Sequence, residues 1–204
     1  NDVHLIFQQL SGLAAPLTLK HLLQSPFTLH QGVLDRIERE TAHARDGRPG
    51  RIVAKMNALN EPQVMRALYE ASQAGVQVDL VVRGACTLRT GIPGISDNIR
   101  VRSVVGRFLE HHRIWWFGND GTPDLYCSSA DWLERNLLRR VETAFPVLDA
   151  DCAQRVHREG LLNYLADNQN AWDLQADGSY AKAVPGEGEA AFSAQLSLLE
   201  DLYA

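Results

Sequence analysis

Apolar and polar residues recur along this chain with two different periods, which predict helices alternating with strands. Residues 32–45 place apolar side chains at every third or fourth position opposite a charged face, and the turn residues of DGRPG follow. Residues 61–75 repeat this helical pattern, with Pro62 in the first turn and Gly75 at the end. Both segments therefore predict amphipathic helices.

Two short β-prone runs, 51–59 and 76–84, flank the second of these helices. The run 76–84 is almost continuously apolar, as in a buried parallel strand, so residues 51–84 predict a βαβ unit with a right-handed crossover. Four further strands and two C-terminal helices follow, with a polar, weakly patterned stretch at 168–187 between the helices. The strands are expected at 98–105, 113–118, 124–129 and 139–147, and the helices at 151–167 and 188–203. The fold class is α/β.

Composition limits the classes of function that the chain can have. The 204 residues are 45% apolar, enough for one substantial core, and a net charge of −5 argues against a general nucleic-acid binder. The three cysteines form no C-x-x-C pair, which argues against a disulfide framework or zinc site and fits the cytoplasm. No apolar run is long enough for a transmembrane segment, and the first residues lack the basic-then-apolar pattern of a secretion signal. The chain starts at Asn1 without a methionine, which suggests a fragment of a longer protein.

Ligands of open α/β sheets gather beyond the carboxyl ends of the strands. Arg83 directly follows the apolar strand 78–82, and Gly84 then permits close approach of a backbone or ligand. A guanidinium in this position needs an anion or a carboxylate to offset its desolvation. Two interpretations stay open, a bound phosphate and a structural salt bridge.

The stretch RFLEHHRI contains adjacent histidines. Because side chains alternate along a strand, His111 and Arg113 share a face and His112 points the other way. The small residues 128–130 of CSSADW would let a ligand or another backbone approach.

Arg140 and Glu142 are two positions apart on the next predicted strand, and so share a face. Arg83 and Arg140 are expected on adjacent strand ends, where they would form a local positive pocket. Arginines, a histidine and a carboxylate beside small-residue turns suit phosphoryl transfer, which needs cationic donors and a proton carrier. A strand-edge histidine with surface arginines explains the same pattern equally well.

Two pairs near these motifs have ordinary structural interpretations. Lys55 and Asn57 alternate on one face near a strand end, where they could contact phosphate or form a structural polar network. Trp115 and Trp116 are adjacent in a strand, so one is expected in the core and the other over an apolar face.

Three longer stretches together resemble one known family. RIVAKMNALNEPQVMRALYEASQAGVQVDLVVRG, GIPGISDNIRVRSVVGRFLEHHRI and CSSADWLERNLLRRVE are similar to signature blocks in the C-terminal part of bacterial type 1 polyphosphate kinases. The resemblance is strong over 1–167 and weak beyond. It implies a phospholipase D-like catalytic domain over 1–167, with a mixed sheet flanked by helices, and a tail over 168–204 with one helix packed on the same domain.

The resemblance also implies a role for each site residue. His111 matches the family's second active-site histidine, Arg83 a phosphate-binding arginine, and Arg140 with Glu142 the nucleotide-contacting pair. Arg113 stands where the phospholipase D superfamily usually has lysine. The histidine that becomes phosphorylated lies in the preceding domain, outside this chain. No metal ligand is assigned here, and Mg²⁺ would arrive with ATP and be held mainly by the other domains.

The implied activity is the reversible transfer of the terminal phosphate of ATP to inorganic polyphosphate through a phosphohistidine. The expected partners are ATP or ADP, polyphosphate and the remaining domains, and the full-length enzyme is expected to form a homo-oligomer. This piece would supply half of the active site and be inactive alone. One alternative is a docking or oligomerisation module whose site is unused. Another is a phospholipase D-type phosphodiesterase with His111 as nucleophile, which needs paired histidines and hence a dimer.

Overall fold

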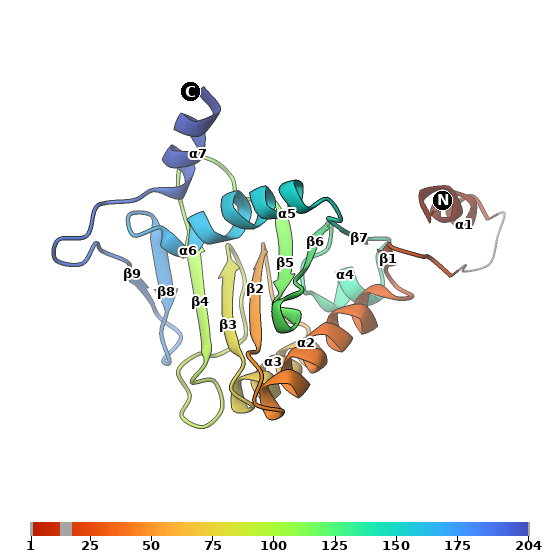
Figure 1. The fold of residues 1–204 in the computed structure, drawn as a ribbon, viewed down its shortest axis with the longest axis horizontal. Coiled ribbons are helices and arrows are strands. Elements are labelled where there is room, and N and C mark those ends of the chain that lie inside the picture. Colours follow the sequence, from red (N-terminus) through yellow and green to blue (C-terminus); the bar gives the residue numbers. More distant parts are fainter. Residues whose placement is uncertain (1, 13–17, 204) are drawn as a thin grey trace.

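The computed structural model describes residues 2–12 and 18–203. Within these ranges nine strands form a single mixed sheet, with helices on both faces (Figure 1). The helical segments are α1 (Asp2–Leu10), α2 (Leu29–Arg45), α3 (Pro62–Gln73), the 3₁₀ turn η1 (Asn119–Gly121), α4 (Glu134–Leu138), α5 (Ala150–His157), the π-helical η2 (Arg158–Leu162), α6 (Asn163–Ala166) and α7 (Ala194–Tyr203). The strands are β1 (Leu23–Gln24), β2 (Arg51–Met56), β3 (Gln77–Val82), β4 (Ile99–Val104), β5 (Arg113–Phe117), β6 (Asp124–Ser128), β7 (Thr143–Pro146), β8 (Ala171–Leu174) and β9 (Tyr180–Lys182).

The sheet runs in the order β1-β7-β6-β5-β2-β3-β4-β8-β9. Strands β2, β3 and β4 are parallel, and the α/β class and the predicted β2–α3–β3 unit are confirmed. Strands β5, β6 and β7 form an antiparallel meander beside β2. The start of β5 and the end of β6 consequently lie on the same edge of the sheet as the carboxyl ends of β2 and β3.

Local sequence explains where α3 begins and ends. The Glu61 side chain accepts a hydrogen bond from the backbone N–H of Val64 at 2.6 Å, and Pro62 occupies the first helical turn. Gly75 adopts a φ of +101° just after the helix, a conformation that costs glycine little. These devices fix both ends of the crossover, so β3 begins in register with β2.

The core has two layers, one on each face of the sheet. Helices α2 and α3 cover the larger layer, and the continuous α5–η2–α6 segment covers the other. In Figure 1 α5 and α6 cross near the top of the strands, while α2 and α3 pass near the bottom. Helix α7 stands above the sheet in this view, and α1 lies apart from it to the right.

The tryptophan pair divides as the sequence predicted. Trp115 is buried and lies 5.7 Å from Trp132 between ring centroids, a contact of the kind that adds about 0.5–1.5 kcal/mol beyond area burial. Trp116 is half-buried on the opposite face and stacks on His157 at 4.8 Å.

Two of the sequence predictions are corrected by the structure. Arg140 and Glu142 do not lie on a strand, because β7 starts only at Thr143 and the segment before it follows the short helix α4. The weakly patterned stretch 168–187, for which no element was predicted, contains β8 and β9. Strand β8 pairs with β4, and this long-range pairing leaves little trace in the local pattern.

The tail also differs in its helix. The helix expected over 188–203 begins only at Ala194. The boundary between a domain at 1–167 and a tail at 168–204 stays a prediction, although β8 and β9 extend the same sheet. Among the described residues, every helix is too short or too polar to cross a membrane.

The π-helical stretch η2 generates a test of packing. A Cβ atom on Gly160 would overlap Cδ1 of Ile114, a buried residue of β5. Gly160→Ala should therefore destabilise the protein by about 1–3 kcal/mol through overpacking. Chemical denaturation of the wild type and the variant measures this.

Ile114→Val provides the matched control, since valine lacks the overlapping methyl group. Alone it should cost about 0.5–1.5 kcal/mol. The double variant Gly160→Ala/Ile114→Val should be almost as stable as Ile114→Val alone. Additive losses would show that the Gly160–Ile114 contact is not the cause.

Candidate active site

Five neighbouring strands bring polar groups to one edge of the sheet. Asn57 follows β2, Arg83 follows β3, and Arg113 begins β5. Arg113 pairs in register with Ser128 at the end of β6, and Ser128 in turn pairs with Ala144 near the start of β7. The sequence predicted such an edge from the strand ends alone.

Asp131 joins the middle of this edge. Its carboxylate accepts hydrogen bonds from the backbone N–H of Asn57 at 2.7 Å and from the Asn57 side chain at 3.1 Å. Arg113 donates to both carboxylate oxygens, at 3.1 and 3.2 Å. Both partners of this bidentate ion pair are largely buried, which favours a fixed geometry. Arg113 is thus a structural arginine with a neutralising partner.

His111 lies beside the Arg113 guanidinium. Arg113 Nη1 donates to the His111 carbonyl oxygen at 3.1 Å and lies 3.4 Å from His111 Nδ1. The imidazole is exposed, and its residue precedes β5 in an irregular segment. A solvent-accessible imidazole next to a fixed guanidinium can exchange protons or hydrogen bonds with a ligand on this edge.

His112 lies on the opposite side of the chain. Its Nε2 atom is 2.9 Å from Lys55 Nζ and 3.3 Å from the Gly160 carbonyl oxygen. Its ring meets that of Tyr164 edge-on at 5.3 Å. Burial, followed by the positive charge of Lys55, lowers the pKa of His112 to about 4, so the ring is neutral at pH 7.

Lys55 and Asn57 take part in separate polar networks. Lys55 is 2% exposed and pairs with Glu110 at 2.5 Å, while its Nζ lies 3.9 Å from the centroid of the Tyr164 ring. Burial lowers the pKa of Lys55 to about 8. Of the two interpretations left open by the sequence, a structural polar network accounts for the contacts of both residues.

Glu142 is held by side chains from the CSSADW turn and from α4. Ser129 Oγ donates to one carboxylate oxygen, and Asn136 Nδ2 donates to the other at 2.7 Å. The backbone N–H of Thr143 donates to Ser129 Oγ at 3.1 Å. The Glu142 carboxylate is therefore oriented before any ligand arrives.

Arg83 and Arg140 differ from Arg113, because within 2–12 and 18–203 neither guanidinium has an ion pair or hydrogen bond. The salt-bridge interpretation of Arg83 therefore does not apply among these residues. The two arginines are not on adjacent strand ends, which corrects the expectation from sequence. Strands β2, β5 and β6 lie between β3 and β7, so the two strand ends are roughly 20 Å apart along the edge.

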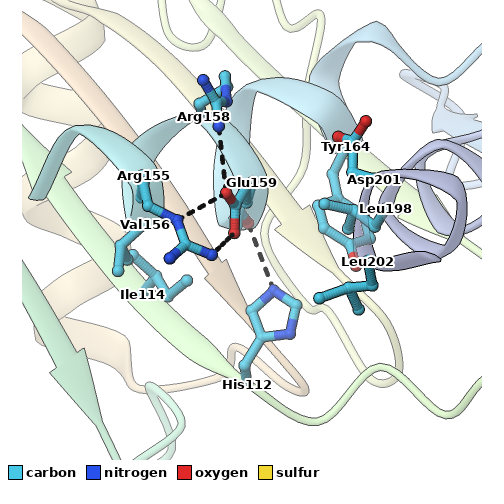
Figure 2. Close-up of a pocket in the computed structure, with 11 residues that line it drawn as sticks. His112, Ile114, Arg155, Val156, Arg158, Glu159, Tyr164, Leu198, Asp201 and Leu202 are labelled. Atoms are coloured by element: carbon cyan, nitrogen blue, oxygen red, sulfur yellow. Dashed lines mark hydrogen bonds and ion pairs between the residues drawn. The ribbon is translucent and has the colours of Figure 1, made fainter. Parts of the chain in front are cut away.

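Two pockets lie next to these residues, one beside the Lys55 network and one at the edge of the sheet. A groove of about 910 Å³ lies beneath α5–η2–α6 and α7, where Figure 2 shows His112 below the helix and Leu198 and Leu202 beside Tyr164. A smaller pocket of about 290 Å³ places Arg83 with Trp172 of β8 and Tyr180 of β9.

The sequence missed the residues that organise the site. Asp131, Ser129 and Asn136 stand inside the quoted CSSADWLERN block, but nothing in a single sequence says which partners they hold. Glu110 is adjacent to the histidines, and the sequence likewise gave no sign of its pairing with Lys55. Across the described part of the chain, no group of three or more His, Cys, Asp or Glu side chains is arranged to hold a metal ion.

Comparison with known proteins identifies the family. Residues 22–195 match the model of the polyphosphate kinase C-terminal domain 2. A polyphosphate kinase of Xylella fastidiosa (strain 9a5c) is 68% identical over 201 residues, covering 98% of this chain and 29% of that protein. A polyphosphate kinase of Neisseria meningitidis serogroup B is 57% identical over 188 residues, covering 92% of this chain and 27% of that protein. This chain thus spans less than a third of the relatives' length.

Comparison with solved structures supports the same family assignment. The crystal structure of polyphosphate kinase from Porphyromonas gingivalis has a TM-score of 0.94 and 37% identity, over 99% of this chain and 31% of that one. The phospholipase D family member Nuc from Salmonella typhimurium has a TM-score of 0.51 at 17% identity, over 76% of this chain and 96% of that one, and shows the fold alone. The phospholipase D-like fold is confirmed, and the chain belongs to the polyphosphate kinase C-terminal domain 2 family.

Proposed function

We propose that this chain supplies one half of the active site of a polyphosphate kinase, which reversibly transfers the terminal phosphate of ATP to inorganic polyphosphate. The observation that carries the proposal concerns Arg83 and Arg140, whose guanidinium groups have no ion pair or hydrogen bond within the described residues. They flank an edge whose middle presents His111. Guanidinium groups that are free of protein partners bind phosphate oxygens strongly, because both partners are charged. On a chain with a net charge of −5 they create a local anion site.

The spacing of the two arginines favours an extended polyanion. A single phosphate cannot reach both ends of an edge roughly 20 Å long, whereas a nucleotide and a polyphosphate end placed side by side can. Arg113 contributes little free charge, since Asp131 neutralises it. Its part is to hold the backbone of His111.

The two remaining residues take complementary parts. His111 would donate a hydrogen bond or a proton to the oxygen on which negative charge builds as the phosphoryl group moves. Glu142 repels phosphate but accepts hydrogen bonds, so it would contact the hydroxyl or amino groups of the nucleoside. Ser129 and Asn136 already hold its two oxygens in place.

Other parts of the proposal lie outside this chain. The phosphohistidine and most ligands of the nucleotide would belong to the preceding domains of the same enzyme. Mg²⁺ would accompany ATP and be held mainly there. A cytoplasmic location and a homo-oligomeric full-length enzyme stay predictions.

The chain alone should form no polyphosphate, because the phosphorylated histidine lies elsewhere. Purified chain, incubated with ATP and Mg²⁺ and assayed for polymer, tests this. The full-length enzyme provides the positive control under the same conditions. ATP-dependent polymer from the isolated chain would contradict the half-site assignment.

The two histidines should differ in the full-length enzyme. His111→Ala should lower the rate of synthesis by about 100-fold or more, the size expected for losing a positioned proton-transfer group. His112→Ala should cost less than about fivefold, since its ring contacts the Lys55 network and not the edge. Steady-state rates of the two variants, measured side by side, decide this. Equal losses, or a larger loss for His112→Ala, would refute the assignment of His111.

Anion binding by the chain should depend on ligand length. Arg83→Ala and Arg140→Ala should each weaken binding of a polyphosphate chain by about 10-fold at low salt, as expected for the loss of a charge-assisted contact. Inorganic phosphate should bind weakly to both variants and to the wild type. Calorimetric titration at two salt concentrations measures these affinities.

Arg45→Ala is the matched control, because this exposed arginine ends α2 just before the start of β2, at the opposite edge of the sheet. It should bind polyphosphate like the wild type. If Arg45→Ala and Arg83→Ala weaken binding equally, the attraction is diffuse and the edge is not the site.

A further inference from the structure

The segment that carries His111 has no secondary structure of its own. Residues 105–112 connect β4 to β5, and in the described structure residues 106–112 make no backbone–backbone hydrogen bond. A segment of this kind would normally sample many conformations. Its conformation here depends on side chains from other elements.

Gln195, in the first turn of α7, binds the middle of this segment. Its Oε1 accepts a hydrogen bond from the Phe108 backbone N–H at 2.9 Å, and its Nε2 donates to the Phe108 carbonyl oxygen at 2.9 Å. The amide thus satisfies both backbone groups of one residue, as a neighbouring strand would. Nε2 also donates to Glu110, the residue before His111.

The geometry at Gly106 shows how closely Gln195 approaches. A Cβ atom on Gly106 would overlap Oε1 of Gln195 and lie 2.8 Å from its Cδ. The Gln195 side chain is 5% exposed, so it has little room to move aside. Glycine at position 106 is therefore what allows the amide to reach Phe108.

Glu110 continues the connection into the centre of the sheet. It is 6% exposed and pairs with Lys55 Nζ, which projects from β2. A buried ion pair is costly to form and strongly destabilising to break from one side, so it fixes the position of its partners. The residue before His111 is thereby anchored to a central strand.

Both sides of His111 are then held. Glu110 on one side is bound by Lys55 and Gln195, and Arg113 on the other is bound by Asp131 and by its pairing with β6. We propose that Gln195, Glu110 and Lys55 form a positioning network through which helix α7 holds His111 toward the phosphate edge. The inference rests on the proposed function, because it concerns the same histidine.

The arrangement gives the C-terminal helix a specific part in the reaction. Leu198 and Leu202, one and two turns beyond Gln195, lie beside Tyr164 in Figure 2, and Tyr164 packs on Lys55. The packing of α7 against α6 and the hydrogen bonds of Gln195 to Phe108 therefore belong to the same interface. Displacement of α7 would therefore release the segment that carries His111, although α7 itself need not contact a ligand.

The test uses the full-length polyphosphate kinase to which the chain is proposed to belong. Gln195→Ala should lower kcat by about 10-fold and change KM for ATP by less than about twofold, because a misplaced catalytic group impairs the reaction step more than binding. Gly106→Ala, which displaces the amide from the other side, should have the same effect. Leu196→Ala, at the exposed neighbouring position on α7, should retain the wild-type rate.

Combination with His111→Ala separates positioning from general damage to the fold. If Gln195 acts through His111, adding Gln195→Ala to His111→Ala should cause no further loss. If Gln195→Ala lowers kcat by the same factor in the wild type and in His111→Ala, or leaves the wild-type rate unchanged, the inference is overturned. Thermal melting of every variant identifies loss of fold, and Gly106→Ala, on an exposed glycine, carries the test if Gln195→Ala melts.

The His111→Ala reference also separates this inference from the proposed function. A large loss for His111→Ala with a full rate for both Gln195→Ala and Gly106→Ala would overturn the positioning network alone. A full rate for His111→Ala would overturn the proposed function and the network with it.

Discussion

The carboxylate of Asp131 is the constraint on which the candidate site depends. It binds Arg113 through two hydrogen bonds and Asn57 through two more, and so connects the start of β5 to the end of β2. The carboxylate and the guanidinium are both largely buried, and removal of either would leave the other charge without its partner. The backbone of His111, which Arg113 contacts, takes its place from this pair.

Strand β2 supplies polar groups to two separate networks. Asn57, just beyond its end, belongs to the Asp131 network at the edge, whereas Lys55 enters the layer beneath α6 and pairs with Glu110. The two networks converge on the segment that carries His111, one from each side. An exposed histidine can therefore have a defined direction, although the segment lacks strand or helix hydrogen bonds.

Three arginines near the edge illustrate how the environment separates a paired, structural guanidinium from an unpaired one. Arg113 is paired and largely buried, so its charge is satisfied within the protein. Arg83 and Arg140 have no such partner among the described residues, which leaves their charges available for the anion site proposed above. The residue type is the same in all three. The presence or absence of a carboxylate within reach makes the difference, and that depends on which strands become neighbours.

The sequence by itself determined the class of the fold, the β2–α3–β3 unit and the family, because hydrophobic period, helix caps and contiguous motifs are local properties. It also indicated that His111 and His112 point to opposite sides, although both residues precede β5 and so lie outside the strand whose alternation was the basis of that prediction. It could not place Arg140 off a strand, find β8 and β9, or join Gln195 to the segment before His111. These features arise from pairings between residues far apart in the chain, and only the tertiary structure decides which distant donor meets which acceptor. A single sequence records the groups but not their partners, because a hydrogen bond or an ion pair leaves no periodic pattern.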